Sequence, residues 1–430
     1  MESQRGIKQP MSTILANCHV THLESAIDGT RYDAGLLQST HEGRPLWVRY
    51  DLDGIRGSVT PTDLQSRPPT MWRYQELLPN RSMEDVVSLG EGMSPLLTCP
   101  RLGELLGVPG LMVKDESQLP TGSFKARGLC MAITMAKYFG VERIAIPTAG
   151  NAGGAAAAYA ARAGLEAFVF MPDDTPAINQ YECALAGAHT FRVNGLIDAC
   201  GRIVREGMEE MGWFDLSTLK EPYRIEGKKT MGLELAEQLD WRLPDVIVYP
   251  TGGGTGLIGM WKAFQELKEL GWLKTDRMPR MVSVQSTGCD PIVQAFDKGL
   301  RFAEPVKNAQ TMARGIRVPS AVGDFMILDA IRESGGCAIS VPEESLLAWM
   351  AEATSKEGIP FCPESSACVG AVDSLVRDGW VDRDERVVIF NTGAVQKYTE
   401  AIAVDLPEMD CTQAIDWEAF RARCGRDEKA

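Results

Sequence analysis

Lys125 stands in a turn whose residue types could hold an amine ready for covalent chemistry. The run PTGSFKARG at residues 120–128 is rich in glycine and small hydroxyl residues, and an apolar helix is predicted to follow at 128–138. A lysine that forms a Schiff base must be held rigidly, partly desolvated and close to an anion-binding loop. This segment meets that need, but an ordinary turn lysine would fit it equally well. The choice therefore depends on loops elsewhere in the chain.

Two further loops of small residues each lie between a predicted strand and a predicted helix. The first follows a strand at 144–147 and opens an alanine-rich helix, and the second follows a strand at 246–249 and opens a helix at 257–270. Glycines let the backbone approach an anion, and a helix N-terminus presents free N–H groups to it. The loops could therefore bind a carboxylate or a phosphate. Their residues are Thr148, Ala149, Gly150, Asn151 and Ala152 in the first, and Gly252, Gly253, Gly254 and Thr255 in the second.

The elements that must position these residues alternate along the chain. From residue 88 onwards, short β-rich runs are separated by helical stretches, which indicates parallel βαβ units in an open, doubly wound α/β sheet. Such sheets bind ligands at the carboxyl ends of their strands. The expected strands are 111–114, 144–147, 167–171, 190–193, 246–249, 281–285 and 387–390.

The order of these motifs resembles that of the fold type II pyridoxal-phosphate enzymes. PTGSFKARG, the GN loop at Asn151, the run PTGGGTG and a late NTG around Thr392 follow one another as they do in that family. Threonine synthases look most similar, because the runs at 226–230 and 313–318 also read like theirs. The similarity covers roughly residues 89–401. It is specific for the family rather than for the reaction, since the group also includes cysteate synthase and threonine dehydratase.

The resemblance implies two doubly wound α/β domains of the tryptophan synthase β type, with the cofactor in the cleft between them. We expect a small domain at 132–224 and a large cofactor-binding domain at 61–131 and 225–410. Residues 1–60 would form a separate extension, and residues 411–430 a C-terminal tail.

The resemblance also implies a role for each candidate residue. Lys125 would form the Schiff base with pyridoxal phosphate and then move protons as general base and acid. Asn151 would lie beside the ring hydroxyl oxygen of the cofactor, although it could also cap a helix. Thr392 would contact the pyridine nitrogen, which a neutral hydroxyl leaves largely unprotonated, although it could also be a plain turn residue. The cofactor phosphate would lie on Gly252, Gly253, Gly254 and Thr255, and the substrate carboxylate on Thr148, Ala149, Gly150 and Ala152.

The reaction implied by the threonine synthase resemblance is γ-elimination of phosphate from O-phosphohomoserine, followed by addition of water at Cβ. Arg314 and Arg317 could bind the substrate phosphate, because an arginine fork fits that group, or they could form structural ion pairs. Some residues depart from the pattern. Ala126 stands where the family usually has an acidic residue, and Ala149 and Ala152 stand where many relatives have hydroxyl residues. The phosphate loop also lacks the NAGN run common in threonine synthases. A β-elimination or β-replacement on another amino acid therefore stays open.

The composition is that of a large globular enzyme, and the family resemblance implies a small-molecule amino-acid substrate. The 430 residues are 44% hydrophobic and 24% charged, and the net charge of −14 argues against nucleic acid or anionic membranes as partners. No apolar run approaches the ~20 residues of a membrane helix. Eleven cysteines without paired spacing, in a chain without a secretory signal, indicate reduced thiols in the cytoplasm. A homodimer is the expectation from the family.

The first 60 residues are expected to contain a strand near 43–51 and to bind no metal. Threonine synthase relatives often carry a small cysteine-pair ribbon in this region. This chain has only Cys18, with His19, His22 and His41 nearby, and no CxxC pair. A degenerate, metal-free ribbon is therefore favoured over a mixed Cys/His zinc site.

Two other functional classes fit less well. The glycines at 254–259 satisfy the GxGxxG pattern of a nicotinamide dehydrogenase, but the next predicted strand ends in Ser286 and Thr287 rather than in the acidic residue that binds the ribose. A non-catalytic binding protein with this fold would not need the intact Lys125.

Overall fold

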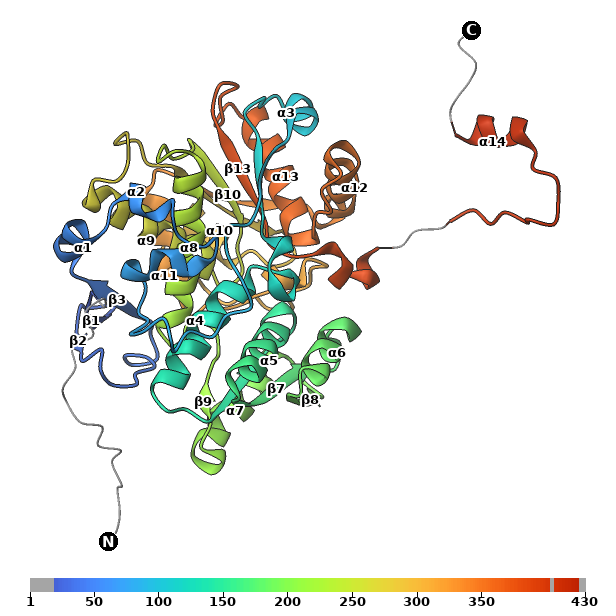
Figure 1. The fold of residues 1–430 in the computed structure, drawn as a ribbon. Helices are drawn as coiled ribbons and strands as arrows, with labels where there is room; N and C mark the ends of the chain where they lie inside the picture. The colour runs from blue at the N-terminus through green and yellow to red at the C-terminus, as the bar shows by residue number, and fades with distance from the viewer. Residues whose placement is uncertain (1–18, 403–405, 425–430) are drawn as a thin grey trace.

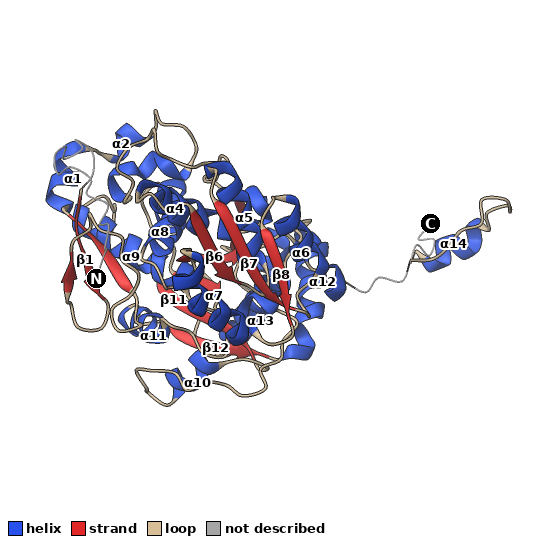
Figure 2. Ribbon diagram, turned by 90° about the horizontal axis from the view of Figure 1, so that it is seen from below, coloured by secondary structure: helices blue, strands red, loops and turns tan. Residues whose placement is uncertain are grey.

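The chain forms two helix-covered sheets and one small sheet in a computed structural model that describes residues 19–402 and 406–424. Figure 1 shows the small N-terminal sheet at one side of the body, and Figure 2 shows the two larger sheets as separate layers of strands. The α/β class and the doubly wound arrangement expected from the sequence are confirmed.

The larger sheet has six strands and is covered by helices on both faces. Its strands are β4 (Leu96–Thr98), β5 (Met112–Asp115), β10 (Val246–Pro250), β11 (Arg280–Ser286), β12 (Cys337–Val341) and β13 (Val387–Asn391). Its helices are α3 (Pro100–Leu106), α8 (Tyr223–Gln238), α9 (Thr255–Leu270), α10 (Pro291–Asp297), α11 (Asp324–Glu333), α12 (Leu346–Glu357) and α13 (Pro363–Arg377). The order is β12-β11-β10-β13-β5-β4, and all neighbours are parallel except β4 and β5.

Alternation along the central strand explains how this sheet is buried on both sides. Ile247 and Tyr249 belong to the apolar cluster with α8, α9 and α11, whereas Val246 and Val248 belong to the cluster with α3, α12 and α13. Successive side chains of a strand point to opposite faces, and continuous apolar runs rich in β-branched residues are typical of parallel strands buried on both faces. The apolar run at 246–249 therefore predicts that this strand lies in the interior of the sheet.

The smaller sheet follows the same plan in the middle of the chain. Its strands are β6 (Arg143–Pro147), β7 (Glu166–Pro172), β8 (His189–Val193) and β9 (Phe214–Asp215), and its helices are α4 (Lys125–Tyr138), α5 (Asn151–Ala163), α6 (Ala177–Leu185) and α7 (Ile197–Met211). The order is β8-β7-β6-β9, with all pairs parallel. Ile144 and Val169 pack with α4 and α5, and Ala145 and Phe168 pack with α7.

The N-terminal segment forms an antiparallel sheet of the order β2-β1-β3. The strands are β1 (Val20–Ser25), β2 (Arg31–Tyr32) and β3 (Leu46–Tyr50), followed by α1 (Leu52–Ser58) and α2 (Pro61–Leu64). The strand expected near 43–51 is thus confirmed as β3. Cys18 lies outside the described residues, and within them no group of three or more His, Cys, Asp or Glu side chains could hold a metal ion.

Short 3-10 turns complete the fold, and a last helix, α14 (Trp417–Arg423), lies apart from the body in Figure 1. The turns are η1 (Met71–Leu77), η2 (Glu116–Gln118), η3 (Pro120–Gly122), η4 (Arg314–Ile316), η5 (Glu343–Ser345), η6 (Val395–Lys397) and η7 (Thr399–Ala401). Across residues 19–402 and 406–424, no helix is both long and apolar enough to cross a membrane.

A buried ion network connects α4 to the large sheet. Arg127 donates from Nε to Glu116 at 2.6 Å and from Nη1 to Glu234 at 2.6 Å, and Lys114 lies 3.1 Å from Glu234. All four side chains are fully buried. The helices α4 and α8 carry two of these residues and run through the domain boundaries expected at 131/132 and 224/225, which stay predictions.

Candidate active site

The turn that carries Lys125 is clamped to the end of β13. Lys125 is the first residue of α4, the N–H of Phe124 donates to the carbonyl oxygen of Thr392 at 3.1 Å, and Ser123 pairs with Gly393 in an antiparallel bridge. The Lys125 Nζ lies 3.8 Å from the centroid of the Phe124 ring. The structure therefore brings together Lys125 and Thr392, which are far apart in the sequence.

Burial is the main cause of a lowered pKa at Lys125, which falls to about 7. The positive charges of Arg224 and Lys397 act in the same direction, whereas the carboxylate of Glu364 opposes them. A lysine with its pKa near neutrality carries a large fraction of free amine, which is both a nucleophile and a base.

A second buried lysine lies beside the first. The Nζ of Lys228 donates to the carbonyl oxygen of Phe124 and lies 3.9 Å from the centroid of the same ring. Burial, followed by the charge of Lys125, holds the pKa of Lys228 well below its ordinary value. The sequence pointed to this segment only through its family resemblance and gave no role to Lys228.

Asn151 begins α5 and faces the turn that follows β13. Its Nδ2 donates to the Tyr398 hydroxyl at 3.1 Å, and its Oδ1 accepts from Asn179 at 3.3 Å. A Cβ on Gly393 would lie 3.2 Å from the Asn151 Nδ2, so a glycine there gives the amide room. The alternative role of Asn151 as a helix cap is wrong, because the N-cap of α5 is Gly150.

Thr148 shapes the loop before α5. Its Oγ1 accepts from the N–H of Gly150 at 3.2 Å and of Gly153 at 3.1 Å, and donates to the carbonyl oxygen of Gly150 at 2.9 Å. Ala149 and Ala152 add no side-chain hydrogen-bonding group. A carboxylate in this loop would therefore depend on backbone N–H groups at the start of α5.

The glycine loop between β10 and α9 has no room for side chains at Gly252 and Gly254. Gly254 has a φ of +75° and caps α9, and a Cβ there would lie 2.2 Å from Ile327. A Cβ on Gly252 would lie 2.9 Å from the carbonyl oxygen of Gly315. In the part of the chain that the structure describes, the N–H groups of Gly252, Gly253 and Gly254 donate to no hydrogen bond. Such free amides at a helix N-terminus suit a phosphate.

Thr392 is buried and lies among small polar side chains. It is 5% exposed, its N–H donates to the Ser365 hydroxyl at 2.9 Å, and its own hydroxyl is 3.8 Å from the Cys362 sulfur. Burial raises the pKa of Cys362 to about 12, so the thiol stays neutral. The surroundings of the Thr392 hydroxyl are those of a buried polar site rather than of a surface turn. Cys362 and Ser365 were not predicted from the sequence.

Arg314 and Arg317 both contact Asp174. Arg314 donates from Nη1 to the carbonyl oxygen of Asp174, and Arg317 lies 3.3 Å from the carboxylate of the same residue. Between them the Gly315 N–H donates to Glu364 at 2.6 Å. Glu364 is the carboxylate that acts on the pKa of Lys125, so this segment borders the site while both arginines reach across to Asp174.

Arg224, at the start of α8, is a buried positive charge near Lys125 with incomplete hydrogen bonding. It is 3% exposed, its Nη1 donates to Thr218 at 2.9 Å, and its Nε lies 3.7 Å from Glu221. The Nε and Nη2 nitrogens have no hydrogen-bond partner in the described structure. The Thr218 methyl lies 3.0 Å from the position of a Cβ on Gly253, so Arg224 is next to the glycine loop. Burying a guanidinium whose hydrogen bonds are incomplete is costly, and a further anion beside it would lower that cost.

Comparison with known proteins places this site in a family. Residues 87–393 match the model of the family described as "Pyridoxal-phosphate dependent enzyme". The chain belongs to this family. The threonine synthase of Methanocaldococcus jannaschii is 36% identical over 367 residues, which cover 85% of this chain and 90% of that protein. The threonine synthase of Methanosarcina acetivorans is 37% identical over 375 residues, covering 87% and 91%. This chain is therefore a pyridoxal-phosphate-dependent, threonine synthase-like enzyme of amino-acid metabolism.

Solved structures of pyridoxal-phosphate enzymes share the fold at low identity. The processed threonine deaminase isoform 2 of Solanum lycopersicum has a TM-score of 0.63 at 19% identity and covers 79% of this chain and 96% of its own. Maize serine racemase has a TM-score of 0.62 at 20% identity and covers 77% and 92%. The interpretation of the glycines at 254–259 as a dehydrogenase fingerprint is excluded by the family.

The residues of the site fit the cofactor of this pyridoxal-phosphate family. The N–H groups of Gly252 and Gly254 make no other hydrogen bond within the described structure, and a side chain at either position would clash with its neighbours. A glycine loop with free backbone amides at a helix N-terminus is the kind of site that binds a phosphate. The amine of Lys125 has the lowered pKa that attack on an aldehyde requires. Thr392, clamped to the same turn, offers a buried neutral hydroxyl.

Proposed function

We propose that this enzyme is a threonine synthase, which converts O-phosphohomoserine and water into threonine and phosphate. The names of the curated relatives support this reaction, and one observation in the structure carries it: the buried guanidinium of Arg224 has two nitrogens that make no hydrogen bond to a described residue. The glycine loop already offers a cradle for the phosphate of the cofactor. A second anion, the phosphate of the substrate, would satisfy Arg224.

Pyridoxal phosphate, when bound, supplies an aldehyde for the lysine amine and a ring that withdraws electrons from the substrate α-carbon. We propose that Lys125 holds the cofactor and, with its pKa near 7, takes protons from Cα and Cβ and returns protons to carbon. Lys228 keeps the lysine turn in place through its bond to the carbonyl oxygen of Phe124. Phosphate leaves from Cγ with the bonding electrons, and water supplies the hydroxyl at Cβ.

The remaining site residues orient the two reactants. We propose that Asn151 lies beside the ring hydroxyl oxygen and that Thr392 contacts the pyridine nitrogen. The cofactor phosphate would lie on the backbone of Gly252, Gly253, Gly254 and Thr255, and the substrate carboxylate on the loop of Thr148, Ala149, Gly150 and Ala152.

Arg314 and Arg317 keep the two roles that the sequence left open. Their contacts with Asp174 support an ion-pair role that holds the domains together around the substrate. Arg224 is the better candidate for the substrate phosphate, because two of its buried nitrogens make no hydrogen bond to a described residue.

The direct test is an assay of threonine and phosphate together, with O-phospho-L-homoserine and the cofactor-loaded protein. Equal release of both supports the proposal. If neither forms while serine, threonine or phosphoserine is converted to other products, the enzyme is a β-eliminating or β-replacing member of the family instead.

Arg224→Gln tests the observation on which the proposal depends. We expect the KM for O-phosphohomoserine to rise at least about tenfold, because a charge-assisted contact to phosphate is lost. Arg301→Gln is the matched control, since it removes an equal charge from an exposed residue that is paired with Asp329. An unchanged KM in Arg224→Gln would contradict the assignment. A cytoplasmic location and a homodimer stay predictions, and sedimentation analysis tests the second.

A further inference from the structure

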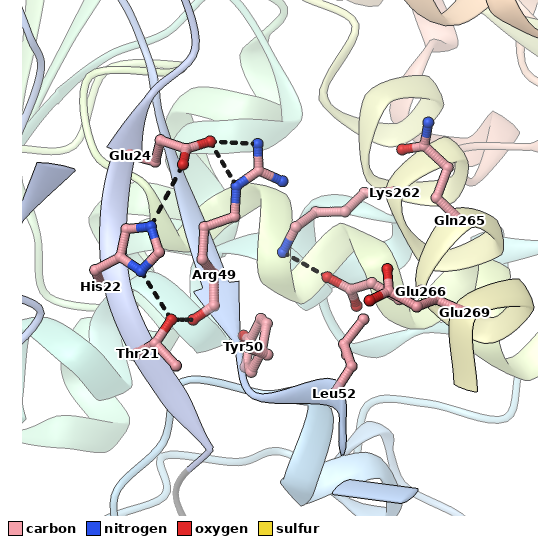
Figure 3. A pocket seen from close by; sticks show the side chains of 10 residues that line it. All are labelled: Thr21, His22, Glu24, Arg49, Tyr50, Leu52, Lys262, Gln265, Glu266 and Glu269. Carbon is pink, nitrogen blue, oxygen red and sulfur yellow. Dashed lines mark hydrogen bonds and ion pairs between the residues drawn. The ribbon is translucent and has the colours of Figure 1, made fainter. Parts of the chain in front are cut away.

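A cavity of about 480 Å³ lies between the N-terminal sheet and helix α9. Figure 3 shows its two walls: side chains from β1 and β3 on one side, and side chains from α9 on the other. Neither the lysine turn nor the glycine loop lines it, so this cavity is separate from the candidate active site. Its volume is in the range of small-molecule sites.

The strand wall presents an arginine with an open donor. The Nε and Nη2 of Arg49 donate to Glu24 at 2.9 and 2.7 Å, and His22 supports the same carboxylate from 3.4 Å. The third nitrogen, Nη1, has no partner among the described residues. Because Glu24 holds the Nε and Nη2 nitrogens, the guanidinium of Arg49 is fixed in place and offers one further donor, Nη1, to an acceptor in the cavity.

The helix wall presents an acceptor of the opposite charge. Glu266 lies 3.0 Å from Lys262, whereas the carboxylate of Glu269 has no ion pair or hydrogen bond to any described side chain. Tyr50 and Leu52 lie between the walls in Figure 3. The Nζ atoms of Lys229 and Lys262 lie 4.0 and 4.8 Å from the centroid of the Tyr50 ring, and Leu52 supplies an apolar side chain. One wall therefore offers the open Nη1 donor of Arg49, the other offers the open carboxylate of Glu269, and Leu52 offers an apolar contact between them.

We propose that this cavity binds a free α-amino acid as an effector. Its carboxylate would contact Arg49, its ammonium group Glu269, and its side chain the ring of Tyr50 and the methyl groups of Leu52. This inference goes beyond the proposed function and holds whichever amino acid the active site converts.

A buried charge network connects the cavity to the active site through α8. The hydroxyl of Tyr50 donates to Glu226 at 2.7 Å, and Glu226 also lies 2.6 Å from Lys262 and 2.7 Å from Lys229. Glu226 and Lys229 alternate along α8 with Arg224 and Lys228, which lie beside Lys125. A ligand that shifts Tyr50 therefore acts on the helix that holds the charges around the reactive lysine.

The test uses the cofactor-loaded full chain and the twenty protein amino acids, each at 10 mM in a thermal-shift assay. We expect at least one to raise the Tm by about 2 °C or more, because a ligand that binds only the folded state stabilises it. Titration calorimetry then gives its affinity. Arg49→Gln and Glu269→Gln should each weaken that affinity at least tenfold and leave kcat/KM without effector unchanged. Glu209→Gln on the exposed face of α7 is the control and should bind normally.

Two results would overturn the proposal. The first is that no amino acid shifts the Tm; the second is that affinity is retained in both cavity variants, which places the ligand in the active site. Tyr50→Phe tests the connection separately: this variant should bind the amino acid within about threefold of the parent but lose its effect on kcat/KM. A full effect on kcat/KM in Tyr50→Phe would rule out the route through Glu226.

Discussion

The pH dependence of cofactor attachment follows from the pKa of Lys125. With a pKa of about 7, roughly a tenth of the amine is neutral at pH 6, half at pH 7 and nine-tenths at pH 8. An ordinary lysine, with a pKa of about 10.4, would be only ~0.04% neutral at pH 7. Because only the neutral amine attacks an aldehyde, the cofactor-free enzyme should react about a thousandfold faster at pH 7 than such a lysine would.

The assay is stopped-flow absorbance of cofactor-free protein mixed with pyridoxal phosphate in amine-free buffers from pH 5.5 to 10. The rate should rise through pH 7 and become constant above about pH 8. The same reaction with Nα-acetyl-lysine corrects for ionisation of the cofactor itself. Borohydride reduction and peptide mass spectrometry should locate the attachment at Lys125, and Lys125→Ala should show neither attachment nor turnover.

Two charge variants test the causes of the lowered pKa of Lys125. Removing the negative charge in Glu364→Gln should move the midpoint of the rate profile to lower pH, and removing the positive charge in Arg224→Gln should move it to higher pH, each by about one unit. A rate that keeps rising tenfold per pH unit up to pH 10 would refute the reasoning. Shifts of the same sign in both variants would refute the assignment of causes.

Three further substitutions test other parts of the structure. Gly254→Ala should weaken cofactor binding at least about tenfold in a spectroscopic titration, because its Cβ would meet Ile327 at a positive φ; Gly271→Ala, at φ +70° with nothing within 4 Å, is the control and should bind normally. Arg127→Met should lower the free energy of unfolding by about 3–5 kcal/mol in a denaturant titration, since among the described residues it leaves the buried carboxylate of Glu116 without an ion pair and Glu234 with Lys114 alone, and a loss below about 1 kcal/mol would contradict this. Thr392→Val should lower kcat about tenfold with little change in KM, and an unchanged kcat would remove Thr392 from the cofactor site.

The alternation of strand, loop and helix could be predicted from the sequence because it depends on local patterns of residues. The central strands and the loops at 148–152 and 252–255 are continuous short segments, and their apolar runs and glycines need no distant partner to be recognised. Helix α4 begins three residues earlier than expected, at Lys125 itself, because the bonds of its turn to β13 fix those residues. Strand β12 was missed, since Cys337–Val341 pairs only on one side and carries mixed side chains.

The buried charges could not be predicted, because their roles depend on contacts across the fold. Arg224 and Lys228 lie on a helix that is buried almost all round, so the periodicity of α8 gave no sign of which charge faces the site. Arg314 and Arg317 have the right chemistry for phosphate, but the structure places Asp174 within reach of both. Residue type predicts what a side chain can bind, whereas tertiary position decides what it meets.

The place of β13 in the larger sheet has a consequence for biosynthesis. This strand is the last of the sheet to leave the ribosome, yet it lies between β10 and β5 in its interior. Until it is inserted, both neighbours expose unpaired edges, which are templates for aggregation. Non-local pairings of this kind also slow folding. A nascent chain cannot close the lysine turn before β13 is in place. We therefore expect pyridoxal phosphate to bind only when translation and folding are almost finished. Premature termination upstream of this strand should yield insoluble, colourless product.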